Sequence, residues 1–278
     1  MAASEEWLLS PCVLECEPVG PYSGFRGSSS ALAFGIGGFL RLYDTETGKG
    51  LSEGLAAHCR GTIRSIALAR RGGELLCASS SDDKIVTVRD CGSNKDIKTI
   101  KLSKKASALA FSHDCKWILV ADKYGEVHVA SLAGTSEQGE EEQSRAGVAS
   151  TEHTSLLLGH FCSIITCMVF CPLGRYLATA DRDAKIRINL FPEDPAGVNG
   201  ATYIQSYCLG HSEYVAGMSF VQCGTDSARS VLLSGSGDGT VNFTTENDTA
   251  SVRRCSLCER PRLAWLGAGP CVELQERG

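Results

Sequence analysis

The sequence lacks long apolar runs and a surplus of positive charge. No apolar stretch approaches the roughly 18 residues of a membrane-spanning helix, and the acidic start, MAASEEWLLSPCVLECEP, has no apolar core of a secretion signal. The formal net charge of the 278 residues is −5. A domain that holds a polyanion by itself usually carries a basic surplus. We therefore expect no membrane association, and we expect nucleic acid to be contacted mainly through a partner.

The sequence also lacks the spacing of a metal or nucleotide site. The 14 cysteines are scattered, and in a reducing intracellular compartment most of them act as small buried hydrophobes. Cys255, Cys258 and Cys271 fall short of the four regularly spaced ligands of structural zinc. The stretch GIGG at 35–38 lies in a β-turn context rather than between a strand and a helix. We predict that the chain holds no metal and no other cofactor.

A repeated pair of strands is present where helical periodicity is missing. No stretch keeps a helical period over four turns, whereas an apolar strand, a turn with Asp or Gly and a second alternating strand recur together. The copies are LAFGIGGFLRLYD (32–44), LLCASSSDDKIVTVRD (75–90), ILVADKYGEVHVASL (118–132), YLATADRDAKIRINLF (176–191) and LLSGSGDGTVNF (232–243). Aligning their turns makes Gly37, Asp83, Tyr124, Asp183 and Asp238 equivalent, at spacings of 46, 41, 59 and 55 residues. A propeller blade takes about 40–45 residues, and longer spacings leave room for loops.

A further strand precedes four of these copies. The four segments are TIRSIALA (62–69), ASALAFS (106–112), IITCMVF (164–170) and YVAGMSF (214–220). Each alternates or is continuously apolar, as a half-buried or central strand is. The polar turns RRGGE, HDCK and PLGR then lead into the next strand. The pattern predicts an all-β fold, namely a WD-repeat β-propeller with about five recognisable blades within residues 1–245.

Two segments interrupt the repeat. Residues 133–155 are acidic and poor in apolar residues, so we expect a flexible loop between blades. After Phe243 the pattern ends, and residues 246–278 are predicted to form an irregular or disordered tail. A seven-bladed ring would need roughly 300 residues. We therefore expect an incomplete propeller in a truncated or variant chain.

Three copies carry a histidine before the strands and a hydroxyl residue on them. We expect each histidine to bond the turn aspartate and the hydroxyl, because a buried aspartate must be paired. The predicted sets are His58, Ser79 and Asp83; His160, Thr179 and Asp183; and His211, Ser234 and Asp238. A catalytic triad uses the same residue types, but one active site does not need three copies. We predict a structural role and no enzyme activity. The tryptophan that usually closes such a network is replaced at Arg89, Asn189 and Thr244, so the networks are expected to be rewired.

Three longer sequence segments point to one family among the WD-repeat proteins. They are VADKYGEVHVASL, LLLGHFCSIITCMVFCPLGRYLATADRDAKIR, and SYCLGHSEYVAGMSF followed by LLSGSGDGTVNF. Together they resemble the WD-repeat, non-catalytic subunit of the eukaryotic tRNA (guanine-N7)-methyltransferase, over about residues 30–243. The tail after residue 243 does not match, and the family's last blades have no counterpart.

The resemblance implies a role for the chain. In this family the propeller binds an S-adenosylmethionine-dependent catalytic subunit and keeps it active, and the pair methylates a guanine of tRNA. It implies a heterodimer with that subunit, contact with tRNA through the complex, and a nuclear location. The alternative is a general WD-repeat scaffold in another assembly, such as a ubiquitin-ligase adaptor or a chromatin platform.

The resemblance also implies where the partner binds. The candidate residues are Lys123, Asp181, Arg182, Lys185 and Arg187. The last two alternate with isoleucines, so they project from the opposite face of their strand. Arginine suits bidentate pairing with a partner carboxylate. Without the resemblance, these side chains would be assigned as solvated charges on an outer strand.

Overall fold

The computed structural model describes seven stretches of the chain. They are residues 12–16, 31–45, 47–51, 61–133, 154–222, 230–245 and 253–256. The predictions for His58, for the acidic loop between residues 134 and 153, and for Cys258 and Cys271 lie outside these residues.

The described residues form nineteen strands and no helix. They assemble into five antiparallel sheets in which strands that follow one another along the chain are neighbours. The strands are β1 (Cys12–Cys16), β2 (Ala31–Ile36) and β3 (Phe39–Asp44) in the first sheet; β4 (Ile63–Arg71), β5 (Glu74–Ser81), β6 (Ile85–Asp90) and β7 (Lys95–Lys101) in the second; β8 (Ala106–Phe111), β9 (Trp117–Asp122), β10 (Glu126–Ser131) and β11 (Ser155–Gly159) in the third; β12 (Ile165–Phe170), β13 (Tyr176–Asp181), β14 (Ile186–Leu190) and β15 (Ile204–Cys208) in the fourth; and β16 (Val215–Gln222), β17 (Ser230–Ser236), β18 (Thr240–Thr245) and β19 (Arg253–Ser256) in the fifth.

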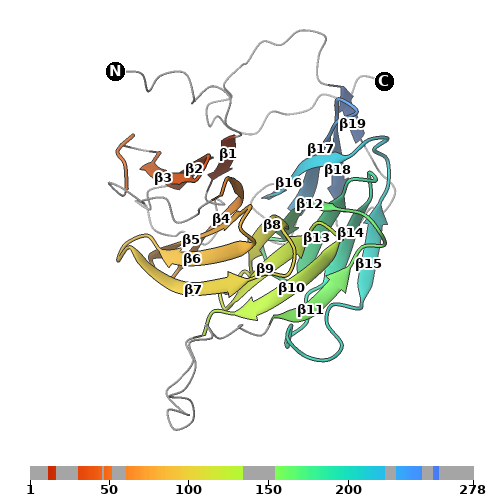
Figure 1. Ribbon diagram of the computed structural model, residues 1–278. Helices are drawn as coiled ribbons and strands as arrows, with labels where there is room; N and C mark the ends of the chain where they lie inside the picture. Colours follow the sequence, from red (N-terminus) through yellow and green to blue (C-terminus); the bar gives the residue numbers. More distant parts are fainter. Residues whose placement is uncertain are drawn as a thin grey trace.

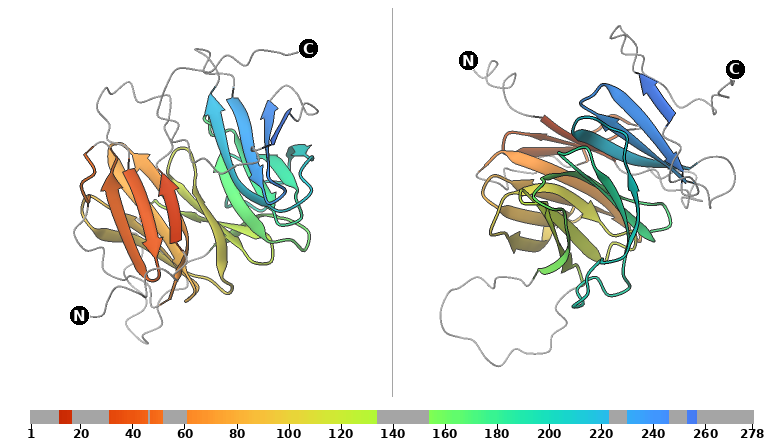
Figure 2. Two further views of the ribbon diagram at one scale, coloured as in Figure 1. Left: turned by 90° about the horizontal axis from the view of Figure 1, so that it is seen from above. Right: turned by 90° about the vertical axis from the view of Figure 1, so that its right-hand side faces the viewer.

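The five sheets are the blades of a propeller. They follow one another in an arc, with the first and the fifth at its two ends (Figures 1 and 2). The leading strands β4, β8, β12 and β16 contact one another in sequence. The predicted all-β propeller with about five blades is thereby confirmed. No helix within the described ranges has the length and apolar character that a membrane span requires.

Apolar side chains fill the spaces between consecutive blades. The alternation of each strand sends neighbouring residues into different spaces. In β13, for example, Leu177 packs with residues of the third blade, whereas Ala178 and Ala180 pack toward the fifth. All of these small and apolar residues are fully buried, so the alternation in the sequence encodes the packing order of the blades.

Two differences from the sequence pattern concern the ends of the arc. Strand β1, which no repeat phrase predicted, pairs with β2. Strand β19 pairs with β18, so the fifth blade extends past residue 245, where we expected the propeller to end. Backbone pairing with a preceding strand needs no apolar alternation, and the short segment Arg253–Ser256 has none to reveal it.

The topology places the turns that carry the histidine networks at one end of the blades. In an antiparallel meander, the turn between the second and third strands lies at the same end as the connection to the next blade. We call this end the turn face. It carries the turns β5–β6, β9–β10, β13–β14 and β17–β18 and the loops β11–β12 and β15–β16.

Candidate functional site

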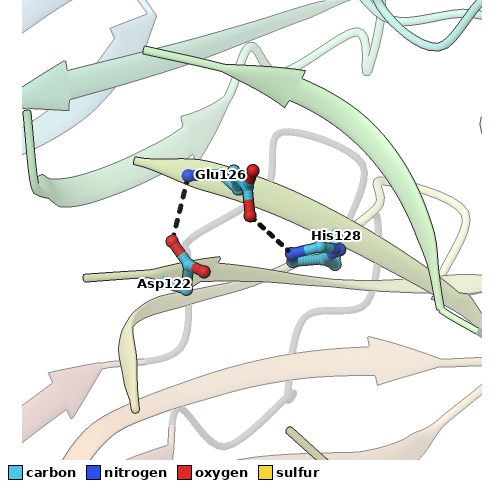
Figure 3. A group of neighbouring side chains, drawn as sticks. All are labelled: Asp122, Glu126 and His128. Atoms are coloured by element: carbon cyan, nitrogen blue, oxygen red, sulfur yellow. Dashed lines mark hydrogen bonds and ion pairs between the residues drawn. The ribbon is translucent and has the colours of Figure 1, made fainter. Parts of the chain in front are cut away.

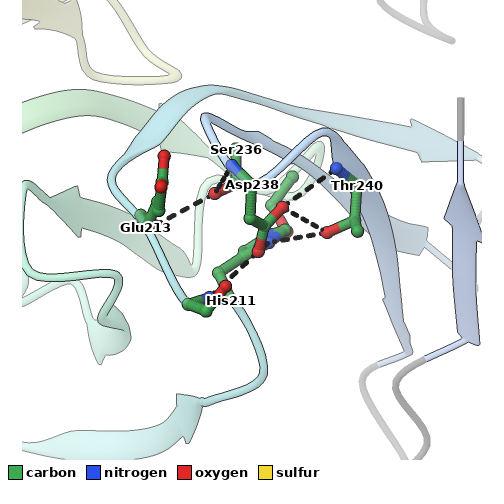
Figure 4. A network of polar contacts seen from close by, with 7 residues as sticks. His211, Glu213, Ser236, Asp238 and Thr240 are labelled. Atoms are coloured by element: carbon green, nitrogen blue, oxygen red, sulfur yellow. Dashed lines mark hydrogen bonds and ion pairs between the residues drawn. The ribbon is translucent and has the colours of Figure 1, made fainter.

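The fifth blade contains the predicted histidine network. His211 Nδ1 lies 3.2 Å from Asp238 Oδ2, and its Nε2 lies 2.9 Å from Ser234 Oγ. Asp238 also accepts hydrogen bonds from the backbone of Ser212 and from the backbone and hydroxyl of Thr240 (Figure 4). The Thr240 hydroxyl is the main reason why the pKa of Asp238 is lowered. The ionised aspartate thus ties the loop β15–β16 to the turn β17–β18.

The fourth blade has the same network with a different acid. His160 Nδ1 lies 2.9 Å from Asp181 Oδ2, and its Nε2 lies 2.7 Å from the Thr179 hydroxyl. Burial lowers the pKa of His160 despite the opposing hydrogen bond from Asp181. The ring is therefore neutral at pH 7, with Nδ1–H donating to Asp181 and Nε2 accepting the Thr179 proton.

Two of the predictions for this blade were wrong. Asp183, predicted as the network acid, is exposed, and only its backbone N–H takes part, by donating to Asp181. Asp181, predicted as a partner contact, is 2% exposed and also accepts the N–H of Lys185. The reason is a two-residue shift between blades: the acid ends the strand in the fourth blade, whereas in the fifth that position is Ser236 and the acid follows in the turn.

The second blade follows the pattern of the fifth. Ser81 ends its strand and donates to Asp83, which also accepts the N–H of Ile85 at 3.1 Å. Ser79 is buried on the same strand. The pairing of Asp83 with His58 stays a prediction.

The third blade uses a lysine where the fourth blade uses a histidine. Asp122 ends β9 and accepts the N–H groups of Tyr124 and Glu126. Lys104 Nζ lies 3.4 Å from Asp122 and 3.0 Å from Glu126, and the bond to Glu126 is the main cause of its raised pKa. Sequence alignment of the turns missed Asp122 because it matched Tyr124 to the turn aspartates. The two strands end alike, in LVAD (119–122) and LATAD (177–181), and this shared ending was the signal that could have identified Asp122.

The same cluster contains potential metal ligands. One donor atom each of Asp122, Glu126 and His128 lies within 4.8 Å of the others (Figure 3). The Lys104 ammonium already pairs with both carboxylates at short range. A metal ion there would have to displace it, so the arrangement is that of an internal ion pair.

Two of the three positions that lack tryptophan form hydrogen bonds within their own blades. Arg89 is buried and pairs with Asp96 at 2.6 Å on the neighbouring strand β7. Asn189 donates to the carbonyl of Ala201 at 2.8 Å. At these two positions the expected rewiring stays within the blade, although Asn189 Oδ1 has no hydrogen-bond partner among the described residues.

The remaining partner-contact candidates gather on the turn face of the third and fourth blades. Lys123, Arg182 and Lys185 are all exposed. Arg182 lies in the β13–β14 turn, and its backbone N–H donates to the carbonyl of Ile164 at the start of the fourth blade. Lys185 leads into β14. The structure brings these cations to one end of two adjacent blades, and their contact with a partner stays a prediction.

Arg187 differs from the other cations because it is half-buried. It pairs in register with Thr179 on β13 and Tyr207 on β15, so it shares the side of the blade that carries the His160 network. Its Nε is buried and has no hydrogen-bond partner among the described residues. An unsatisfied buried donor costs about 1–3 kcal/mol, and an acceptor from another molecule would remove that cost.

Consecutive four-stranded blades tied by His–hydroxyl–Asp networks define a WD-repeat β-propeller. Comparison with known protein families identifies the family of WD-repeat proteins to which the chain belongs. The family described as the tRNA methyltransferase TRM82 WD40 domain matches residues 42–154 and 130–257. The chain therefore belongs to this family.

Curated relatives carry consistent names. The tRNA (guanine-N(7)-)-methyltransferase non-catalytic subunit wdr4 of Dictyostelium discoideum is 35% identical over 220 residues, which are 77% of this chain and 44% of the relative. The subunit of the same name from Danio rerio is 33% identical over 194 residues, 70% of this chain and 40% of the relative. The human subunit WDR4 is 30% identical over 162 residues, 58% and 33% of the two chains. The matched part is thus less than half the length of each relative.

Proposed function

We propose that the chain is a non-catalytic subunit that binds and stabilises the catalytic subunit of a tRNA (guanine-N7)-methyltransferase. In this role it supports the formation of N7-methylguanosine in tRNA without carrying out the chemistry. The names of its relatives, all of them non-catalytic subunits of that enzyme, support the assignment. A nuclear location goes with it, and imaging of a tagged chain tests this part.

The observation that carries the proposal is the unpaired, buried Nε of Arg187. The guanidinium suits a carboxylate, and because the side chain is half-buried, part of its desolvation has already occurred on folding. Lys185 lies two residues earlier on the same side of the strand and adds a second positive charge.

The histidine networks support a scaffold rather than an enzyme. Each imidazole is engaged at both nitrogens with side chains of its own blade. A catalytic triad has the same contacts, but the side chains of His160 and His211 are 5% and 1% exposed, which closes these networks to a substrate. The networks instead fix the loops and turns of the turn face, which positions the cations around Arg187.

Titration of the purified catalytic subunit tests the proposal. Arg187→Leu should leave the fold intact but weaken binding by about 30-fold or more, since truncating one partner of a buried charge pair costs about 2–5 kcal/mol. Methylation of tRNA should fall with it and recover in part when excess chain is added. Asp183→Ala, on the neighbouring turn, is the matched control. Parental affinity of Arg187→Leu would remove this residue from the interface. Failure of the parent chain to bind would refute the function.

A further inference from the structure

Phe161 is the most exposed aromatic residue that the structure describes. Its side chain is 94% exposed, in the β11–β12 loop on the turn face. Exposing a whole phenyl ring to water forgoes about 1.5–3 kcal/mol of burial. An apolar residue at such a position is therefore a candidate for burial against another molecule.

The fold does not require phenylalanine at this position. The sequence Gly159-His160-Phe161 corresponds to Gly210-His211-Ser212 in the next blade, where a serine stands in its place. Ser212 contributes to its network through its backbone N–H, which any residue except proline can supply. The phenyl ring thus adds nothing that the equivalent blade needs for folding.

The backbone that carries Phe161 is held on both sides. His160 is fixed through both ring nitrogens, and its N–H donates to Gly125 O at 2.8 Å. On the other side, Ser163 is 4% exposed. A β-carbon on Gly125 would lie 2.3 Å from Ser163 O, which shows how closely the β9–β10 turn packs against the loop. The backbone at Phe161 is thus ordered before binding, so binding has to restrict only the side chain.

Positive charge surrounds this loop. Lys123 lies in the turn that packs against it, and Arg182 lies in the turn that bonds to Ile164 just after it. Lys185 follows Arg182 in the same turn. Lys123, Arg182 and Lys185 form no ion pair among the described residues, and Asp183 is the one exposed carboxylate in the β13–β14 turn. By contrast, Arg64 and Lys105 are neutralised by Asp82. A chain of net charge −5 therefore presents a local cationic patch around an apolar ring.

We propose that Phe161 is the apolar anchor of the surface that binds the catalytic subunit, entering an apolar pocket that carboxylates surround. This inference rests on the proposed function. It extends the interface from Arg187 to the turn face of the fourth blade. Central aromatic residues encircled by polar contacts commonly dominate the affinity of such surfaces.

A protein partner fits this surface better than RNA does. Platforms for single-stranded nucleic acid present successive aromatic faces along a basic groove. Here the other exposed aromatic residue on the neighbouring turn, Tyr124, has the Lys104 ammonium 4.2 Å from its ring centre. Among the described residues, the two turns that border the loop offer no other aromatic ring, so Phe161 alone is available for stacking there.

The test compares two serine substitutions in the full chain. Phe161→Ser installs the residue that the fifth blade carries, and Leu173→Ser removes a side chain that is 50% exposed in the β12–β13 turn at the opposite end. Affinity for the catalytic subunit is measured by calorimetry, together with thermal melts and binding of tRNA to the assembled pair. We expect Phe161→Ser to weaken the heterodimer about 30-fold, with an unchanged melting temperature, and Leu173→Ser to bind as the parent does.

Each other outcome has a defined meaning. If Phe161→Ser binds as the parent does while Arg187→Leu fails, the anchor is refuted and the proposed function stands. If Phe161→Ser instead weakens only the binding of tRNA to the assembled pair, the ring is an RNA contact and the inference is overturned. If the parent chain does not bind the catalytic subunit, the proposed function itself fails.

Discussion

Replacing Asp181 by alanine should destabilise the protein far more than replacing its neighbour Asp183. Asp181 is 2% exposed and accepts hydrogen bonds from His160 and from two backbone N–H groups, at 2.9, 2.9 and 3.0 Å. Alanine would leave these three donors without their acceptor. Since one buried unsatisfied group costs about 1–3 kcal/mol, we expect a loss of about 3 kcal/mol. Asp183→Ala keeps the backbone N–H and should stay within about 0.5 kcal/mol of the parent.

Thermal and urea unfolding of both variants measure this difference. At about 2–4 °C per kcal/mol for a domain of this size, Asp181→Ala should melt about 6–12 °C below the parent, and Asp183→Ala within about 2 °C of it. Near-ultraviolet circular dichroism at 20 °C checks that both variants are folded. Equal melting temperatures for the two variants would refute the assignment of Asp181 as the network acid.

Three further predictions concern the turn face. Lys104→Met should lower the melting temperature because two carboxylates lose their counter-ion. Zinc ions should raise the melting temperature of this variant but not that of the parent. A rise in both proteins would show that Lys104 does not compete with zinc for the site. Burial lowers the pKa of His160, so the unfolded chain binds the proton more readily than the folded chain. The free energy of unfolding should therefore fall as the pH drops below about 6.5, by at most about 1.4 kcal/mol per pH unit. Urea unfolding at about pH 5.5 to 7.5 should show a smaller fall for His160→Gln. Gly125→Ala should lower the unfolding free energy clearly more than Gly239→Ala. Both glycines have positive φ, which costs alanine roughly 1–2 kcal/mol, but only at Gly125 would the β-carbon lie 2.3 Å from Ser163 O. Equal losses in unfolding free energy would mean that the loop moves to accommodate the β-carbon.

The sequence by itself determined the leading strand and the strand pair of most blades, and their order. The alternation of small and apolar residues, repeated at blade spacing, identified a strand pair in each of the five blades, because the period of two reflects burial on the two faces of a strand. The network of His211 with Ser234 and Asp238 was likewise predicted, since histidine, hydroxyl and acid all stand at their usual places.

Only the tertiary structure decided which side chains are buried and paired. Asp181 and Asp183 are two residues apart and chemically identical, and the acid that faces His160 depends on where β13 ends. Lys104 replaces a histidine through a contact across 18 residues that no local pattern encodes. The burial of Arg187 Nε and the exposure of Phe161 depend in the same way on how neighbouring blades pack. Periodicity fixes the face on which a side chain lies, whereas its partners are set by segments distant in sequence.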